Sequence, residues 1–313
     1  MTRALTFPGQ GSQTVGMGRD LAESFAAARE VFEEVDEALN EKLSALMFEG
    51  PSDTLTLTQN AQPALMAVSL AVVRVLEREA GFDVARHAAY VAGHSLGEYS
   101  ALAAAGALGV ADTARLLRKR GQAMQRAVPV GEGAMAALLG VELDAAKAIV
   151  ADAAQGEVCA AANDNGGGQI VISGHKAAVE RAMALATERG VKRAMPLPVS
   201  APFHSPLMAP AAREMEEALA QVALKPPRVP VIANVTAAPV SDPETIRGLL
   251  VEQVTGMVRW RETVESFKGL GVTETVELGT GKVLSGLAKR IDRELATASV
   301  GTPADIEAFA KTL

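Results

Sequence analysis

The stretch Ala88-Ala89-Tyr90-Val91-Ala92-Gly93-His94-Ser95-Leu96-Gly97 decides the fold of this chain. Its first five residues form an apolar run suited to a buried strand, and residues 98–108 behind it are rich in Ala and Leu, which favours a helix. Between them, glycines two residues before and two after Ser95 complete the pattern G-x-S-x-G and let the backbone bend sharply. A serine in this strand, turn and helix setting is a nucleophile elbow, in which unpaired N–H groups at the helix N-terminus stabilise an oxyanion. We therefore predict that Ser95 is a nucleophile, with a purely structural turn as the alternative.

The bulk composition predicts a globular enzyme of one or two domains. Of its 313 residues 49% are hydrophobic and 4% aromatic, which is enough to bury a substantial core. The formal charge is −7, from 30 Lys and Arg against 37 Asp and Glu, and no basic block stands out, so we expect no nucleic-acid partner. The longest apolar stretch, residues 101–111, is shorter than the ~18 residues of a membrane span. These features predict a cytoplasmic protein that binds no membrane.

The cysteine count and the glycine motifs argue against two kinds of site. The single cysteine, Cys159, excludes a disulfide framework and a multi-cysteine metal site. Gly9-Gln10-Gly11 lacks the third glycine of a dinucleotide fingerprint, and Gly279-Thr280-Gly281-Lys282-Val283 lacks the spacing of a phosphate-binding loop. Neither glycine motif supports nucleotide chemistry.

The N-terminal region alternates strands and helices. Residues 4–7 are a short apolar strand that runs into Pro8-Gly9-Gln10-Gly11-Ser12-Gln13, a loop whose backbone N–H groups can face a ligand closely. Helical patterns follow at residues 20–46 and 62–80, and then the elbow strand. This alternation is typical of an α/β fold.

The middle of the chain predicts a small inserted domain. Its pattern β-α-β-β-α-β is ferredoxin-like, with two split βαβ units in one antiparallel sheet. We place the first part of the large domain at residues 1–129, the ferredoxin-like small domain at 130–198 and the second part of the large domain at 199–313. The predicted elements of the small domain are strands at 133–139, 158–162, 169–173 and 191–197 and helices at 144–154 and 175–189. In the last part we expect a helix at 211–222, a strand at 229–234 and a strand, turn and helix at 274–290.

A serine needs a base, usually histidine, and the chain has four. His87 and His175 are explained by a polar connection and a helix start, and His94 is a neighbour of Ser95 that points elsewhere at a sharp turn. His204 lies in Ser200-Ala201-Pro202-Phe203-His204-Ser205-Pro206, a loop stiffened by two prolines, and it follows the nucleophile in the order of α/β-hydrolases. We predict His204 as the general base.

A third, acidic member of a triad is hard to place. Between Ser95 and His204, Asp152 and Asp164 fall in the small domain, and Asp112 is expected to cap a helix. We therefore predict a dyad, in which a backbone carbonyl or an amide side chain orients His204.

An arginine lies on an apolar helical stripe. In the helix expected at residues 112–128, Leu116, Arg120 and Met124 recur every four residues. A lone buried charge is costly, so Arg120 needs a partner. The partner is either an internal Asp or Glu, or a substrate carboxylate held by the planar guanidinium. Gly121 beside it allows close approach of another backbone.

With these residues in place, the chain resembles the malonyl-CoA:acyl carrier protein transacylases, the acyltransferase family of fatty-acid and polyketide synthesis. The resemblance spans nearly the whole chain, and an ordered set of motifs is far more specific than any one of them. The landmarks are Phe7-Pro8-Gly9-Gln10-Gly11-Ser12-Gln13, Gln62-Pro63-Ala64, Gly93-His94-Ser95-Leu96-Gly97-Glu98, Arg120-Gly121, Phe203-His204-Ser205 and Glu277-Leu278-Gly279.

The resemblance implies a role for each predicted site residue. Ser95 would be acylated by malonyl-CoA with His204 as base, and Arg120 would bind the free malonyl carboxylate. Met124 and Phe203 complete the expected substrate-binding set, where the bulk of Phe203 would crowd a branch methyl. The oxyanion hole would consist of the N–H groups of Gln10 and Leu96, and the main chain of Gln253 would orient His204.

The resemblance also implies an α/β-hydrolase-like large domain with an inserted ferredoxin-like small domain. The phosphopantetheine thiol of acyl carrier protein would attack the acyl-serine in a ping-pong cycle, without metal or cofactor. We expect a monomer. The alternatives are a serine thioesterase or hydrolase with the same elbow, and a non-catalytic protein that binds the carrier.

Overall fold

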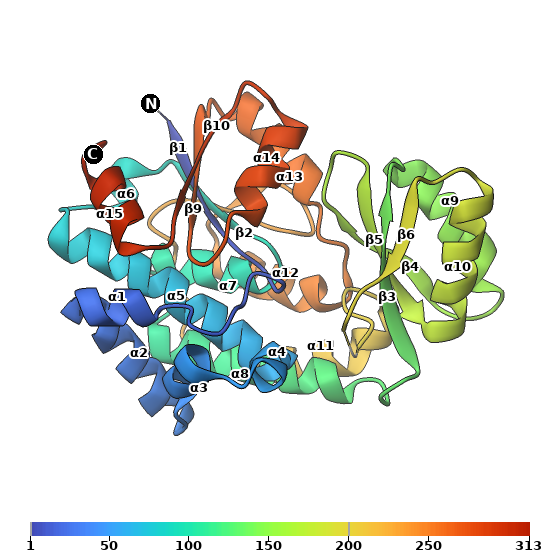
Figure 1. The fold of residues 1–313 in the computed structure, drawn as a ribbon, viewed down its shortest axis with the longest axis horizontal. Helices are drawn as coiled ribbons and strands as arrows, with labels where there is room; N and C mark the ends of the chain where they lie inside the picture. The colour runs from blue at the N-terminus through green and yellow to red at the C-terminus, as the bar shows by residue number, and fades with distance from the viewer. Residues whose placement is uncertain (1, 200) are drawn as a thin grey trace.

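The computed structural model describes residues 2–199 and 201–313, and Ser200 of the predicted His204 loop lies outside the described residues. Its first part forms one strand, six helices, the elbow strand and two further helices, the second of which carries Arg120 (Figure 1). The single helix predicted at 20–46 is wrong, because Phe25 is extended and Asn40 adopts a left-handed conformation, which divides it into three helices. The elements are β1 (Arg3–Phe7), α1 (Arg19–Ser24), α2 (Ala26–Leu39), α3 (Leu43–Glu49), α4 (Ser52–Thr56), α5 (Thr58–Glu79), α6 (Val84–His87), β2 (Tyr90–Gly93), α7 (Leu96–Ala104) and α8 (Val110–Arg126).

The middle part has the predicted order β-α-β-β-α-β, with bounds that differ by a few residues. The elements are β3 (Gly133–Leu139), α9 (Leu143–Ala154), β4 (Cys159–Asp164), β5 (Gln169–His175), α10 (Lys176–Glu188) and β6 (Arg193–Pro196). The last part returns to the larger sheet. It contains a 3-10 turn η1 (Pro206–Met208), α11 (Ala209–Ala220), β7 (Val231–Ile232), β8 (Pro239–Val240), α12 (Pro243–Thr255), α13 (Trp260–Gly269), β9 (Glu274–Leu278), α14 (Val283–Ile291), β10 (Ala296–Val300) and α15 (Pro303–Ala310).

Within the described residues, the larger sheet has the strand order β10-β9-β1-β2-β7-β8 and is parallel except for the pair β7 and β8. Both faces are covered, and side chains alternate between them. Leu5 and Val91 pack with helices α2, α5 and α8, whereas Ala4 and Ala92 pack on the other face with Trp260 of α13. Phe7 pairs with Gly93, so the loops that leave β1 and β2 at their carboxyl ends lie side by side. This edge is where α/β sheets bind ligands.

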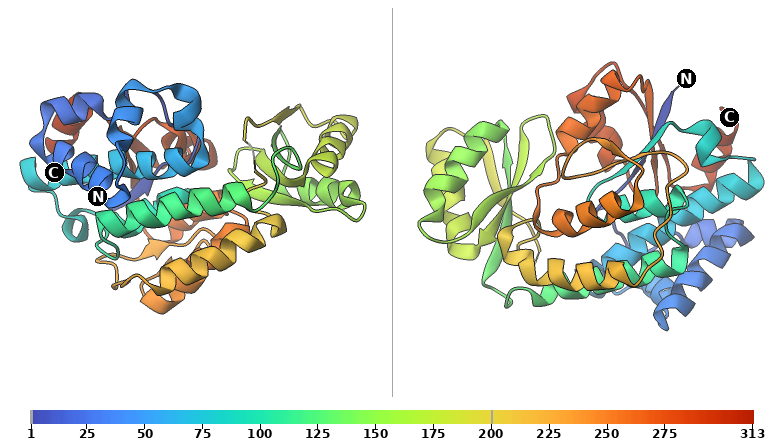
Figure 2. Two further views of the ribbon diagram at one scale, coloured as in Figure 1. Left: turned by 90° about the horizontal axis from the view of Figure 1, so that it is seen from below. Right: turned by 180° about the vertical axis from the view of Figure 1, so that it is seen from behind.

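The smaller sheet has the order β4-β5-β3-β6 and is antiparallel throughout, as two interleaved βαβ units require. Leu138 and Ile172 pack against helices α9 and α10, and Met135 and Ala137 on the opposite face line a cavity. Figure 2 shows this lobe at one end of the molecule, away from both termini. The α/β class is thereby confirmed, and the domain boundaries stay a prediction.

The two sheets are joined through β4 and the segment before α13. The N–H of Asp164 donates to the carbonyl of Val258 at 2.9 Å, and the N–H of Val258 donates to the carbonyl of Ala162 at 2.9 Å. Asp164 also pairs with Arg261 of α13 at 2.8 Å, and the carboxylate is almost fully buried. The small lobe is therefore fixed to the large sheet beside the elbow.

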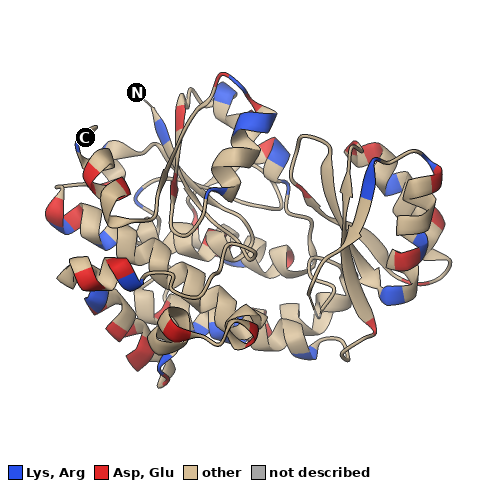
Figure 3. Ribbon diagram, viewed as in Figure 1, with Lys and Arg blue, Asp and Glu red and all other residues tan. Residues whose placement is uncertain are grey.

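Charged residues lie mostly on the helices, and the strands carry few of them (Figure 3). In the part of the chain that the structure describes, no helix is both long and apolar enough to span a bilayer. Nor do the described residues bring three or more His, Cys, Asp or Glu side chains together in a group that could hold a metal ion.

Candidate active site

Ser95 lies at the turn between β2 and α7 with φ 54° and ψ −110°, a conformation rarely adopted by residues with a side chain. The flanking glycines make the turn possible. A Cβ on Gly93 would lie 1.9 Å from the carbonyl carbon of Gly97, and a Cβ on Gly97 would lie 2.2 Å from the carbonyl oxygen of Phe7. Asn234 holds the turn from the side, because its Oδ1 accepts from the N–H of Ser95 at 2.8 Å and its Nδ2 donates to the carbonyl of Gly93 at 2.7 Å.

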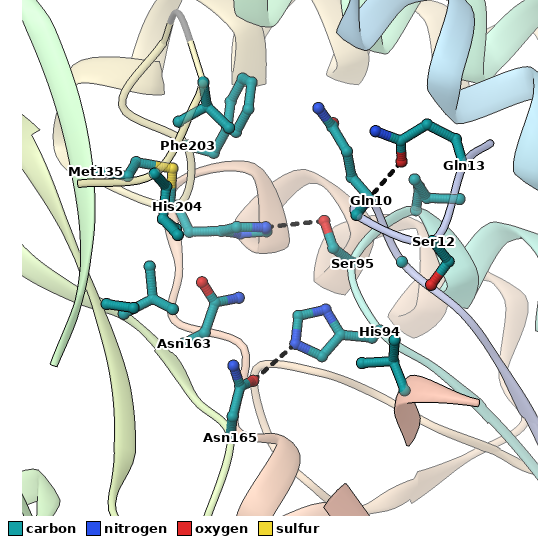
Figure 4. Close-up of a pocket in the computed structure, with 18 of the residues that line it drawn as sticks. Gln10, Ser12, Gln13, His94, Ser95, Met135, Asn163, Asn165, Phe203 and His204 are labelled. Carbon is teal, nitrogen blue, oxygen red and sulfur yellow. Dashed lines mark hydrogen bonds between the residues drawn. The ribbon is translucent and has the colours of Figure 1, made fainter. Parts of the chain in front are cut away.

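His204 reaches the nucleophile from the opposite wall. Its Nε2 lies 2.8 Å from Ser95 Oγ (Figure 4). Its Nδ1 donates to the backbone carbonyls of Gln253 at 2.9 Å and Gly256 at 3.1 Å. Because two carbonyls require a proton on Nδ1, Nε2 is the acceptor and faces the Ser95 hydroxyl. Burial, and then the positive charge of Arg120, lower the pKa of His204 to about 3, so the imidazole is neutral at physiological pH.

The three histidines that the sequence analysis set aside as bases make other contacts. His94 Nε2 lies 2.9 Å from Oδ1 of Asn165, which extends from the small lobe (Figure 4). His175 Nδ1 accepts from the N–H of Val158 at 2.9 Å, and His87 contacts the backbone of Asp83. Of the described histidines, only His204 contacts Ser95 Oγ.

The aspartates between Ser95 and His204 do not orient the base. The prediction that Asp112 caps a helix is wrong, because the helix begins two residues earlier with Gly109 as its N-cap. Asp112 instead pairs with Arg115 on the surface at 3.2 Å. The carbonyls of Gln253 and Gly256, at the C-terminal end of α12, stand where a triad would have its carboxylate.

The backbone N–H groups of Gln10 and Leu96 have no hydrogen-bond partner among the described residues. Leu96 is the first residue of α7, where a free N–H is expected. Gln10 follows the carboxyl end of β1, next to the elbow. Free donors on both sides of a serine are the composition of an oxyanion hole.

Arg120 is 1% exposed and forms part of the same constellation. Its Nη2 donates to Ser95 Oγ at 3.1 Å and to Oε1 of Gln253 at 2.9 Å, and its Nη1 donates to Oε1 of Gln62 at 2.8 Å. The ring of Tyr99 lies 5.7 Å from the guanidinium carbon. No described Asp or Glu forms an ion pair with Arg120, so the internal ion pair considered above has no partner in this part of the chain. Burial lowers the pKa of Arg120, and the nearby Tyr99 and Glu98 oppose this shift in part.

Gly121 explains how Gln62 reaches Arg120. A Cβ on Gly121 would lie 2.5 Å from the Cα of Gln59, so α8 and α5 approach more closely there than a larger residue would allow. The close approach brings the buried amide of Gln62 to the guanidinium.

A cavity of about 390 Å³ opens onto Ser95, His204 and Arg120. Both lobes line it (Figure 4). The large lobe contributes the predicted residues Met124 and Phe203, and the small lobe contributes Met135, Ala137, Asn163, Asn165 and Val171. A largely apolar cavity of this size with a few polar groups is typical of a small-molecule site.

Several polar residues of the site received no role from the sequence. Gln62 and Asn234 are buried amides that fix Arg120 and the Ser95 turn. Glu98 is a buried carboxylate that accepts from Gln253. One available signal was a polar residue within an otherwise apolar helix, as at Gln62 and Glu98. No local signal singles out Asn234, because its partners lie far away in sequence.

Comparisons with known proteins agree with this geometry. The profile described as acyl transferase domain matches residues 5–284. A malonyl CoA-acyl carrier protein transacylase of Bacillus subtilis is 49% identical over 311 residues, which cover 99% of this chain and 96% of that protein. The crystal structure of an acyl-carrier-protein-S-malonyltransferase from Bartonella henselae is 59% identical with a TM-score of 0.98, covering 100% of this chain and 99% of that one.

A second solved structure is of a type II PKS acyl-carrier protein in complex with its malonyl-transacylase. It is 40% identical to this chain with a TM-score of 0.96, and each chain is covered over 100% of its length. The chain therefore belongs to the acyl transferase family and, within it, to the malonyl CoA-acyl carrier protein transacylases.

Proposed function

We propose that this chain transfers a malonyl group from malonyl-CoA to the phosphopantetheine thiol of acyl carrier protein, through a malonyl ester of Ser95. One observation carries the proposal. Ser95 Oγ lies between a neutral imidazole at 2.8 Å and a guanidinium without a carboxylate partner at 3.1 Å. Nucleophile, base and a receptor for a carboxylate thus meet at one atom.

In the first half-reaction, Ser95 Oγ attacks the thioester carbonyl while its proton moves to Nε2 of His204. The N–H groups of Gln10 and Leu96 stabilise the oxyanion. The C–S bond then breaks, and the CoA thiolate takes the proton from His204. In the second half-reaction the carrier thiol gives its proton to His204 and attacks the ester, and Ser95 regains a proton as it leaves. No atom changes oxidation state, so the cycle balances without a cofactor.

Arg120 supplies the preference for an acid-bearing acyl group. A planar guanidinium binds a carboxylate through paired hydrogen bonds, and burial strengthens that attraction. Met124 lies one helical turn from Arg120, and Phe203 is the neighbour of the base, so both restrict the space around the acyl chain. We place the reaction in the cytoplasm and assign it to a monomer, both of which are predictions from the sequence.

Transfer is preferred to the alternative of a thioesterase or hydrolase. The relatives that match nearly the whole chain are named as transacylases. A non-catalytic carrier-binding role is also set aside, since Ser95 Oγ contacts both the imidazole of His204 and the guanidinium of Arg120.

Intact-mass spectrometry tests the proposal. After incubation with malonyl-CoA we expect a single malonyl adduct on the wild-type protein and none on Ser95→Ala. The adduct should be lost when carrier protein is added. The malonyl group must then appear on the carrier. Rapid release of free malonate without the carrier would instead show a hydrolase and contradict the proposal.

A further inference from the structure

Glu98 has a buried carboxylate that the reaction described above does not use. It lies in the first turn of α7, one turn beyond Ser95, and is 1% exposed. Its Oε2 accepts from the N–H of Asn234 at 3.1 Å and from Nε2 of Gln253 at 2.8 Å. Burial raises the pKa of Glu98 to about 7, and the hydrogen bonds from Asn234 and Gln253 and the charge of Arg120 oppose this shift. The group is therefore mainly ionised at pH 8.

Gln253 connects this carboxylate to Arg120. Its Nε2 faces only acceptors, namely Glu98, the Ser95 carbonyl at 3.0 Å and Asn234 Oδ1 at 3.3 Å. Its Oε1 accepts from Nη2 of Arg120 at 2.9 Å. A carboxylate can accept but not donate, so the amide nitrogen must face Glu98 and the amide oxygen remains for Arg120. In the opposite orientation the NH2 group of Gln253 would face the donor Nη2 of Arg120, and the amide oxygen would face the acceptor Oε2 of Glu98.

The guanidinium depends on this orientation because amide oxygens are its fixed partners. Gln62 holds Nη1 and Gln253 holds Nη2, and among the described residues Nε has no partner. Two amide oxygens on the two terminal nitrogens define the plane in which the guanidinium lies. Loss of one would let the plane turn away from Ser95.

We propose that Glu98 is a positioning residue for malonyl selectivity: its carboxylate fixes the amide of Gln253, and that amide fixes Arg120 to receive the malonyl carboxylate. The inference rests on the proposed function, in which Arg120 binds that carboxylate. The main chain of Gln253 independently holds His204, so the side-chain link to Arg120 can be broken without removing the partner of the base.

The first test is Glu98→Gln, which keeps the size of the side chain but allows an NH2 group to face Gln253. Single-turnover loading of Ser95 is measured by intact mass at pH 8 with malonyl-CoA and with acetyl-CoA. We expect malonyl loading to fall about tenfold relative to acetyl loading, as for a coupled network of buried polar groups. The matched control is Glu277→Gln, another fully buried carboxylate, which accepts from the N–H groups of Leu284 and Ser285. This control should leave the ratio of the two donors unchanged.

A second variant keeps the test decisive if Glu98→Gln folds poorly. Gln253→Leu removes the amide but keeps the backbone carbonyl, and we expect the same loss of malonyl preference. Adding Glu98→Gln to Gln253→Leu should not lower the ratio further, because Glu98 acts through that amide. An equal loss with both donors, or a further fall in the double variant, would overturn the inference. A wild-type protein that forms no malonyl adduct would instead refute the proposed function, so the two failures are distinct.

Discussion

At the scale of single residues, the base and the carboxylate receptor are electrostatically coupled. The charge of Arg120 is one of the causes that lower the pKa of His204 to about 3, after burial. A malonyl carboxylate bound to Arg120 would offset that charge and raise the pKa of the imidazole, whereas an acetyl group would not. A protonated His204 cannot accept the Ser95 proton, so loading falls as the pH drops through this pKa. The acid limb set by His204 should therefore lie at higher pH for malonyl-CoA than for acetyl-CoA. The separation should remain in Glu98→Gln, which removes the carboxylate near Arg120 whose pKa is about 7.

Single-turnover loading at saturating donor, followed from pH 8 down to below the pKa of His204, measures the two limbs in the enzyme–donor complex. The matched control is Arg120→Ala with acetyl-CoA, in which the limb should lie at higher pH than in the wild type with acetyl-CoA, because the charge that lowers the pKa of His204 is gone. Coincident limbs in the wild type would mean that the malonyl carboxylate does not offset the charge of Arg120.

The central residues of the site could be predicted because their chemistry is visible in residue type and local pattern. Ser95 has its glycines, and Arg120 interrupts an apolar stripe. The structure brings these two together with His204. Asn234 and the carbonyl of Gly256 could not be anticipated in the same way, because a backbone carbonyl or an amide acquires its role only when distant segments meet.

At the scale of elements, the close approach of α7 to β1 determines whether the elbow can form. A Cβ on Gly97 would lie 2.2 Å from the Phe7 carbonyl oxygen, and backbone on both sides leaves little room to shift. We expect Gly97→Ala to lower the free energy of unfolding by about 3 kcal/mol and to abolish loading of Ser95. Chemical denaturation and intact mass measure the two effects.

The control for Gly97→Ala is the same substitution in another helix. Gly248 lies in α12 with no atom within 4 Å of its added Cβ. Gly248→Ala should raise the free energy of unfolding by about 0.5–1 kcal/mol, because alanine is the better helix former. If Gly97→Ala were as well tolerated as Gly248→Ala, the steric account of the elbow would be wrong.

Elements with a strong periodic pattern were predictable, and those set by tertiary contacts were not. The strand at 133–139 matches β3, whereas the strand expected at 229–234 is reduced to Val231–Ile232. The chain leaves the sheet there because Asn234 turns toward the elbow, and hydrogen-bonds to Ser95 and Gly93. Local strand propensity does not indicate that a residue will bond to a segment so far away in the sequence.

At the scale of the whole molecule, the cavity beside Ser95 is complete only while the small lobe stays against the large sheet. Asn165 and Asn163 enter the cavity from β4 and the turn after it, and the buried Asp164 between them is anchored by Arg261. Removing the cation would leave a buried carboxylate with one partner fewer, which costs about 2 kcal/mol or more. Since the Asp164–Arg261 ion pair joins the two lobes, we expect its loss to let the small lobe open locally away from the large sheet.

Arg261→Met is therefore expected to speed amide hydrogen exchange at Asp164 and Val258, whose N–H groups cross between the lobes, and to raise the KM for malonyl-CoA. Lys268→Met on the same helix is the matched control, because its pair with Glu294 is exposed on both sides, with 76% and 83% of the side chains accessible. Such a pair contributes below about 1 kcal/mol, so exchange and KM should stay as in the wild type. Equal behaviour of the two variants would mean that the lobes are held by their backbone hydrogen bonds and packing alone, and that the Asp164–Arg261 pair has no part in keeping the cavity closed.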